Sequence, residues 1–189
     1  VQRNVIYEER RKVLDGEDLQ EHVQHMIRTV VTGEIAGGMA EHHPENDKDL
    51  QEILAPMAKL FPCELHYTAD ELRKLTPDAL ADAVYDCAMK AYAAREETFG
   101  LQPDGTPLMR ELERVVMLRV VDEYWMDHLE AMDDLRQGIG LRAYGNVKPV
   151  DEYKRAGFDM FDEMVNGIQT ETVRRLFTVR VRREQKLER

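Results

Sequence analysis

Histidine and cysteine side chains, the usual protein ligands of zinc, occur in three short clusters of this sequence. These are the pairs His22 and His25, His42 and His43, and Cys63 and His66. Zinc usually takes four ligands, supplied as two well-spaced pairs. The three clusters mix residue types and lie in unrelated segments, so we expect each to have a surface or core role. No metal site is predicted.

A second candidate for chemistry is an apolar run followed by two carboxylates, as in the strand that holds magnesium in a nucleotidase. Residues 115–121 are largely apolar and precede Asp122 and Glu123. Arg119 interrupts the run, however, and the apolar pattern continues at helical spacing beyond it. The sequence also lacks the GxxxxGK[ST], GxGxxG and GxSxG motifs. A helix is therefore favoured over a nucleotide site, and no catalytic residue is predicted.

His128 is the remaining candidate for acid–base catalysis. It lies on an apolar helical seam, which favours a buried, hydrogen-bonded histidine over a general base. Asp133 and Asp134 have no evident acid–base partner, and a local ion pair with Arg136 is expected instead. The methionines of this region favour ordinary core filling, although adaptable contact with varied apolar ligands stays open; they are Met126, Met132, Met160 and Met164.

Composition indicates a mostly α-helical protein with a heavily charged surface. The chain has 189 residues, of which 43% are hydrophobic and 33% charged, and residues that favour helices dominate long stretches. A net charge of −11 argues against nucleic-acid binding, which needs a basic surface. Residues 174–189 are nonetheless rich in arginine, which fits either a solvated helix end or contact with an anionic membrane surface. Two cysteines do not make a disulfide framework and indicate a reducing compartment.

Helix boundaries are marked by local signals. Thr68 with Glu71 three residues later forms a capping-box pattern, and Thr76 before Pro77 marks a second helix start. That second helix is predicted to end at Gly100. An earlier helix, from about residue 18, is predicted to fade at residues 37–38, a pair of glycines. The Pro- and Gly-rich loop 101–107 is the strongest predicted boundary in the chain.

Two long amphipathic helices follow this loop. The apolar positions of the first are Val121, Trp125, His128, Met132, Leu135 and Ile139, and those of the second are Phe158, Phe161, Val165, Ile168, Thr172, Leu176 and Val179. The short connector 142–149 predicts an antiparallel helical hairpin with the two seams facing each other. Each arm would be on the order of 45 Å long at 1.5 Å per residue.

The stretch from Trp125 to Tyr144 resembles a signature of the SecA family of protein-export motors, Trp-x-x-His-Leu-x-x-Met-Asp-x-Leu-Arg-x-Gly-Ile-x-Leu-Arg-x-Tyr. The resemblance continues through Pro149 and residues 152–161, and residues 5–14 resemble the end of the family's long scaffold helix. The resemblance implies an all-α fold, in which a long antiparallel two-helix finger packs with a scaffold helix and a small, mainly helical wing domain is inserted. Residues 1–15 would be the end of the scaffold helix, 16–108 the wing and 109–189 the two-helix finger.

The resemblance also implies roles for individual residues. The tip of the finger would contact the translocating preprotein and the SecYEG channel through Arg142, Tyr144, Gly145, Asn146 and Lys148. Met160 and Phe161 would belong to a signal-peptide groove. A structural and regulatory role in the finger, which restrains ATP hydrolysis in the family, would fall to Trp125, His128, Met132, Leu135 and Arg136.

The family resemblance places the ATP and magnesium of such a motor outside this sequence, in motor domains of a longer parent chain, with a zinc-binding tail also beyond it. No cofactor and no enzymatic activity are therefore expected of these residues themselves. The expected partners are the channel, the preprotein with its signal peptide, and the motor domains. The expected location is the cytoplasm, peripheral on the inner face of the plasma membrane. Two alternatives stay open from the residues alone: a free-standing helical adaptor, and an accessory domain of a nucleic-acid motor.

Overall fold

Packed helices make up the architecture of the described part of the chain. The computed structural model describes residues 2–16, 19–142 and 148–180. Within these ranges the regular structure consists of seven α-helices, and the one pairing of extended backbone is an isolated bridge between Leu101 and Pro107. The prediction of an all-α fold is confirmed.

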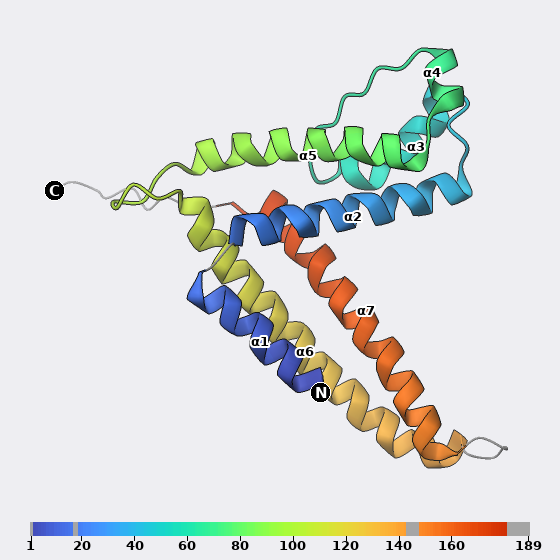
Figure 1. Ribbon diagram of the computed structural model, residues 1–189, viewed down its shortest axis with the longest axis vertical. Coiled ribbons are helices and arrows are strands. Elements are labelled where there is room, and N and C mark those ends of the chain that lie inside the picture. Colours follow the sequence, from blue (N-terminus) through green and yellow to red (C-terminus); the bar gives the residue numbers. More distant parts are fainter. Residues whose placement is uncertain (1, 17–18, 143–147, 181–189) are drawn as a thin grey trace.

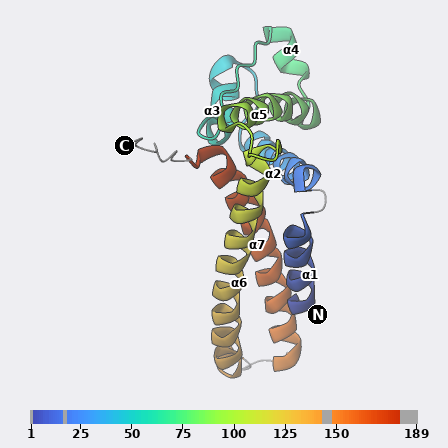
Figure 2. The same ribbon diagram turned by 90° about the vertical axis from the view of Figure 1, so that its left-hand side faces the viewer.

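The two longest helices form the predicted antiparallel hairpin. Helix α6 (Leu108–Arg142) packs along α7 (Pro149–Thr178), and α1 (Gln2–Asp15) lies alongside α6. Both views show α1 beside the hairpin and running in the same general direction (Figures 1 and 2). The predicted long antiparallel helical pair, with a further helix packed along it, is thus present.

The remaining helices gather at one end of the hairpin. They are α2 (Leu19–Glu41), α3 (Asp47–Ala58), α4 (Ala69–Lys74) and α5 (Pro77–Phe99). Helix α2 packs against α3 and α5, and it also contacts α6 and α7. Figure 1 shows this group at the end where α6 begins and α7 finishes, far from the point where α6 leads towards α7. The division into scaffold, wing and finger at residues 15 and 108 stays a prediction.

Local capping chemistry sets the helix boundaries as the sequence predicts. The Thr68 side chain accepts a hydrogen bond from the Glu71 N–H, and the Glu71 carboxylate accepts one from the Thr68 N–H at 2.8 Å, which completes the capping box. Thr76 caps α5 through the Ala79 N–H, with Pro77 at the first helical position. Gly100 ends α5 with a φ of 77°, a backbone conformation that suits glycine.

Helix α2 does not fade at its glycine pair, so that prediction is wrong. The helix continues through residues 37 and 38 to Glu41. A Cβ atom at Gly38 would lie 3.1 Å from Ile53 Cγ2, so the absence of a side chain lets α3 pack closely on α2. Glycine inside a helix costs about 1 kcal/mol relative to alanine. Here the close packing of buried Ile53 offsets that cost.

A buried polar cluster joins α5 to the first turns of α6. Glu113 is fully buried, and its Oε1 accepts a hydrogen bond of 2.5 Å from the Tyr92 hydroxyl. Arg110 Nη2 lies 3.2 Å from the same carboxylate and also pairs with Glu96. Burial raises the pKa of Glu113, although the contacts with Tyr92 and Arg110 act in the opposite direction. The start of the hairpin is therefore anchored to α5 by groups that are shielded from water.

The C-terminal end of α7 is also bound to α5. The Arg95 guanidinium donates hydrogen bonds to the carbonyl oxygens of Leu176, at 3.0 Å, and Val179, at 2.6 Å. These contacts satisfy carbonyls that the last turn of a helix leaves without intrahelical partners. The Phe177 ring packs against Tyr92 and Phe61 with centroid separations of 5.6 and 5.1 Å. Both ends of the hairpin therefore meet at α5.

Candidate functional site

The seam of the hairpin is centred on a cluster of rings. The ring centroids of Trp125 and His128 lie 5.5 Å apart on α6, and His128 meets Phe161 of α7 edge to face at 5.8 Å. His128 is only 5% exposed, whereas Trp125 and Phe161 are half-buried. The two helices thus meet through aromatic contacts in which edge-to-face geometry is favourable.

His128 also connects the hairpin to α1. Its Nε2 lies 3.1 Å from the Gln2 Oε1, and the Gln2 amide donates to the Gly157 carbonyl at 3.1 Å. Burial lowers the pKa of His128, which favours the neutral imidazole. The predicted buried, hydrogen-bonded histidine is confirmed. One side chain of α1 therefore bridges both arms of the hairpin.

Two glycines of α7 provide notches for side chains of α6. A Cβ atom at Gly157 would lie 3.0 Å from Met132 Cε, and one at Gly167 would lie 2.4 Å from Tyr124 Cε1. Real Cβ atoms do not approach other atoms as closely as the second distance. Glycine at position 167 is therefore required for the Tyr124 ring to lie against the α7 backbone.

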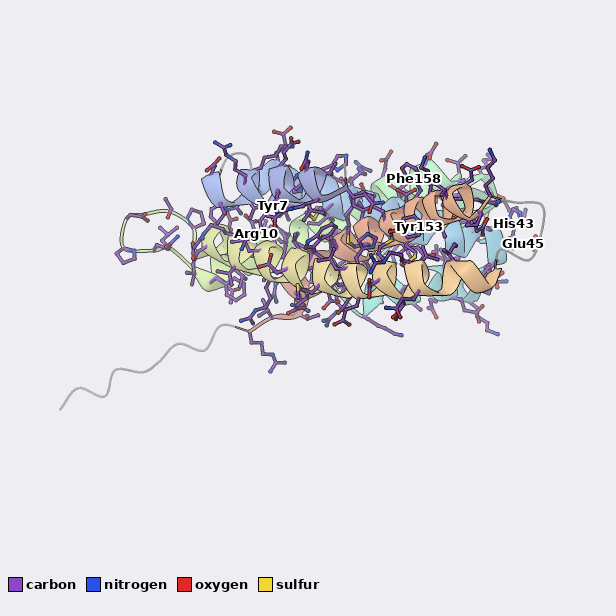
Figure 3. The ribbon with its side chains drawn as sticks, turned by 90° about the horizontal axis from the view of Figure 1, so that it is seen from below. Tyr7, Arg10, His43, Glu45, Tyr153 and Phe158 are labelled. Atoms are coloured by element: carbon purple, nitrogen blue, oxygen red, sulfur yellow. The ribbon has the colours of Figure 1, made fainter. Side chains whose placement is uncertain are left out.

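Ion pairs flank the apolar seam and use the carboxylates that resembled a magnesium site in the sequence. Asp122 of α6 pairs with Arg10 of α1 at 3.0 Å, and Figure 3 labels Arg10 on α1. Glu123 pairs with Arg175 of α7 at 2.6 Å, and this contact lowers the pKa of Glu123. Arg175 also binds Glu171 at 2.6 Å. The two carboxylates therefore hold helices together through arginines.

An open hollow lies between the two arms, towards the connector. Its volume is about 480 Å³. Its lining combines small, apolar and acidic residues, namely Ala131, Asp134, Leu135, Gly138, Ala156, Asp159 and Met160. Met160 thus faces a space that a ligand can enter, whereas Phe161 points into the seam against His128. The two predicted groove residues lie on different faces of α7.

One predicted seam residue is misplaced. Phe158 is 65% exposed, so its assignment to the buried seam is wrong. Gly157 takes the seam position in its place and is buried under Met132 and Gln2. Phe158 lies on α7 near Tyr153, as Figure 3 shows. The helical spacing of large residues alone did not reveal that a glycine would occupy the contact.

The predicted tip residues are only partly described. Residues 143–147, which include Tyr144, Gly145 and Asn146, lie outside the described ranges, as does the side chain of Arg142 at the end of α6. Lys148 is exposed and precedes α7 without making a side-chain cap. Arg136 lies on the outer surface and pairs with Asp133 at 2.7 Å, which confirms the predicted local ion pair.

Among the residues that the structure describes, no three His, Cys, Asp or Glu side chains are placed to hold a metal ion. His42 instead approaches Glu52, with 3.5 Å between Nδ1 and Oε2. His22 and His25 line an open hollow together with Glu9 and Glu21. Over the same residues, none of the helices combines the length and apolar character needed to cross a membrane.

A family model for the SecA wing and scaffold domain matches residues 1–180 of this chain. The chain belongs to the SecA wing and scaffold family. The seam, the hollow and the bridge from α1 are therefore features of a SecA wing and scaffold region.

Longer relatives match almost the whole of this chain. A protein translocase subunit SecA from Frankia casuarinae is 46% identical over 181 residues, which cover 95% of this chain and 18% of that protein. The subunit from Clostridium novyi is 42% identical over 189 residues, or 100% of this chain and 22% of that protein. SecA 1 of Clostridioides difficile is 43% identical over 180 residues, with 95% and 19% covered. The chain spans about a fifth of the length of these SecA proteins.

Some residues that build this SecA-family site have no local signal in the sequence. Gln2 contacts His128 and Gly157, which lie 126 and 155 residues away from it in the sequence. Gly167 is recognisable as special only once Tyr124 is placed opposite it. Trp125, His128 and Met132, in contrast, were predictable because they follow one helical stripe.

Proposed function

We propose that this chain is the polypeptide-contacting and regulatory part of a protein-export motor. The observation that carries the proposal is the long α6–α7 hairpin. The start of α6 and the end of α7 are bound to α5, whereas Arg142 and Pro149 lie at the opposite end of the hairpin (Figure 1). The proposal is supported by family membership and by relatives named protein translocase subunit SecA.

In this proposal the connector touches the translocating preprotein and the SecYEG channel. The contacting residues are Arg142, Tyr144, Gly145, Asn146 and Lys148. An aromatic side chain offers a large contact face for little loss of rotamer entropy, so it suits a protein that must engage many sequences. Basic neighbours such as exposed Lys148 add attraction to acidic groups.

The stem of the hairpin carries the regulatory part of the proposal. His128 packs against Phe161 and Met132 against Gly157, which holds the two arms together, and Trp125 packs beside His128. Leu135 lines the hollow between the arms. Met160 in the same hollow is the residue that an apolar signal peptide would touch. Phe161 would support that surface from the seam side.

ATP hydrolysis would belong to parts of the longer SecA proteins that this chain does not cover. The longer protein would hold ATP and magnesium in its motor domains, and the hairpin would restrain their turnover through its stem. We further propose a peripheral position on the inner face of the plasma membrane. An arginine-rich segment from residue 174 onwards would favour its anionic surface.

The decisive experiment measures preprotein translocation and ATP turnover side by side in the full-length protein carrying Tyr144→Ala. We expect transport to fall at least tenfold while ATP turnover is retained, because the motor would lose its grip on the polypeptide. Tyr7→Ala is the matched control, since Tyr7 is an exposed tyrosine (52%) that belongs to α1 and not to the connector (Figure 3). That variant should transport normally.

Unchanged transport in the Tyr144→Ala protein would contradict the assignment of the connector as the contact site. An equal loss in the Tyr7→Ala control would also contradict it, because the effect would then not be specific to the connector.

A further inference from the structure

An apolar pocket lies where α1, α2 and both arms of the hairpin meet (Figure 2). Its volume is about 260 Å³, and Val5, which is 41% exposed, lies at its rim. Its walls are mostly valine, isoleucine and methionine side chains from all four helices. They include Val5 and Ile6 of α1, Met26 of α2, Met117 and Val121 of α6, and Ile168 of α7. A concave, largely apolar space with a few polar groups is the usual form of a small-molecule site.

One polar group of this lining is buried without a partner. Thr172 of α7 is fully buried, and none of the described residues forms a hydrogen bond with its Oγ1. A threonine inside a helix can donate its hydroxyl to the carbonyl four residues earlier. Three other helical threonines do so at 2.7–3.0 Å, namely Thr29, Thr98 and Thr178. The Thr172 hydroxyl is therefore available to a ligand, and leaving it unpaired is unfavourable.

We propose that this pocket binds a small, neutral, apolar molecule with one hydrogen-bonding group, such as an aromatic alcohol. The apolar body of the ligand would lie against the valine and isoleucine side chains, and its polar group would pair with the Thr172 hydroxyl. Met26 and Met117 are unbranched and adaptable, so they can move aside to expose that hydroxyl. This inference is independent of the proposed export role, because binding alone tests it.

Size and charge narrow the class of ligand. A dry cavity of about 150 Å³ takes one benzene molecule, so 260 Å³ suits a fused two-ring molecule. Glu9 lines the pocket and pairs with Lys12 at 2.7 Å. Burial lowers the pKa of His22, the other titratable group of the lining, which favours the neutral imidazole. The lining, as far as the structure describes it, contains no lysine or arginine, so an anionic ligand would lack a counter-charge.

The test is titration of the full-length protein with 2-naphthol at pH 7.5, followed by isothermal calorimetry. We expect saturable binding at one site with a dissociation constant on the order of 0.1 mM. The matched anionic probe is 2-naphthoate, which keeps the two rings and carries a carboxylate. It should bind at least tenfold more weakly. Hydrogen exchange read by mass spectrometry should show that 2-naphthol slows exchange in peptides from α1 and α2, since the ligand would contact both helices.

Two pairs of variants locate the site. Val5→Phe should fill the rim and weaken binding at least tenfold, whereas Val115→Phe, at a valine of α6 with a similar exposure of 44%, should leave binding unchanged. Thr172→Val should weaken 2-naphthol binding about three- to tenfold through the loss of one hydrogen bond. Thr170→Val, an exposed change on the same helix, is its control.

The unfolding midpoint separates loss of the ligand contact from loss of the fold. Thr172→Val keeps the shape of the side chain and removes a buried hydroxyl that has no partner, so the midpoint without ligand should not fall. The proposal would be overturned by the absence of saturable binding, by equal binding of 2-naphthol and 2-naphthoate, or by binding that neither Val5→Phe nor Thr172→Val weakens.

Discussion

The size of single side chains decides how closely the two helices of the hairpin pack. The Tyr124 ring of α6 lies against the α7 backbone at Gly167, where any Cβ atom would overlap it. Gly138 on α6 has no heavy atom within 4 Å of the position that a Cβ would take. The two glycines are both helical, but only the first is required for packing.

We therefore expect Gly167→Ala to lower the free energy of unfolding by about 1–3 kcal/mol, because overpacking displaces Tyr124. Gly138→Ala is the matched control and should raise it by up to about 1 kcal/mol, because alanine favours the helix without a clash. Urea unfolding monitored by circular dichroism measures both. Equal effects in the two variants would show that Tyr124 moves aside freely.

Glu171 gives the hairpin a specific sensitivity to acid. Hydrogen bonds from Arg174 and then Arg175 lower its pKa from 4.5 to about 2. Because the folded state holds its proton less tightly than the unfolded state, the stabilising contribution is complete above pH 4.5 and is lost as the pH falls towards 2. Glu171→Gln should flatten the dependence of the unfolding midpoint on pH in that window. Glu163→Gln, an exposed change on the same helix, should leave the dependence unaltered.

Contacts between elements depend on α1, which is attached to both arms of the hairpin. Gln2 reaches His128 and Gly157, and Arg10 reaches Asp122. The ion pair is exposed and is expected to contribute little, since exposed pairs are typically worth less than about 1 kcal/mol. The buried contact at His128 should therefore matter more to the docking of α1.

The burial of His128 predicts that stability also depends on pH in a second range, nearer to neutral pH. Its pKa in the folded state is lowered from 6.5, and its neighbours Gln2, Trp125 and Phe161 are uncharged. Between the folded pKa and 6.5 the unfolded state binds more protons, so stability should fall as the pH drops below 6.5. Hydrogen exchange of α1 amides at pH 7.5 and 5.5 would measure this, after correction for intrinsic rates. A His128→Gln variant that kept the same dependence would contradict the assignment.

Element boundaries and the main seam were predictable because their signals are local. The capping box at Thr68 lies within three residues, and the stripe through Trp125 and His128 lies within one helix. Contacts such as Gln2 with His128 or Tyr124 with Gly167 join segments that are distant in the sequence. The spacing of apolar residues within one helix does not predict such contacts. The sequence did not predict that α2 continues beyond Gly38, because the residue that packs against Gly38, Ile53, lies on another helix.

At the scale of the whole molecule, the cluster around Glu113 is one of the places where helices α2 to α5 meet the hairpin, beside the contacts of α2 with α6 and α7. The buried carboxylate has Tyr92 and Arg110 as partners from two helices. Such a cluster is sensitive to the loss of one member, because the remaining polar groups stay buried without a partner. It is therefore the place where a small change should affect both parts of the molecule.

Tyr92→Phe tests this connection while keeping the ring that packs against Phe177. Loss of the hydroxyl should lower the free energy of unfolding by about 1–3 kcal/mol, because Glu113 loses a hydrogen-bond donor. Tyr85→Phe on the same helix is the matched control, since its ring keeps the contact with Arg28, whose guanidinium carbon lies 3.8 Å from the ring centroid. Thermal unfolding of both variants gives the comparison. A Tyr92→Phe midpoint equal to that of the control would show that the bond contributes nothing net.

Helix α6 runs without a break from the Glu113 cluster to Arg142, and this continuity has a geometric consequence. Its 35 residues give a length of about 52 Å at 1.5 Å per residue. From Glu113 to Arg142 the helix spans about 44 Å, so a tilt of about 5° at the cluster would move the far end by roughly 4 Å. A rearrangement at Tyr92 that tilted α6 would therefore produce a larger displacement at the far end of the hairpin.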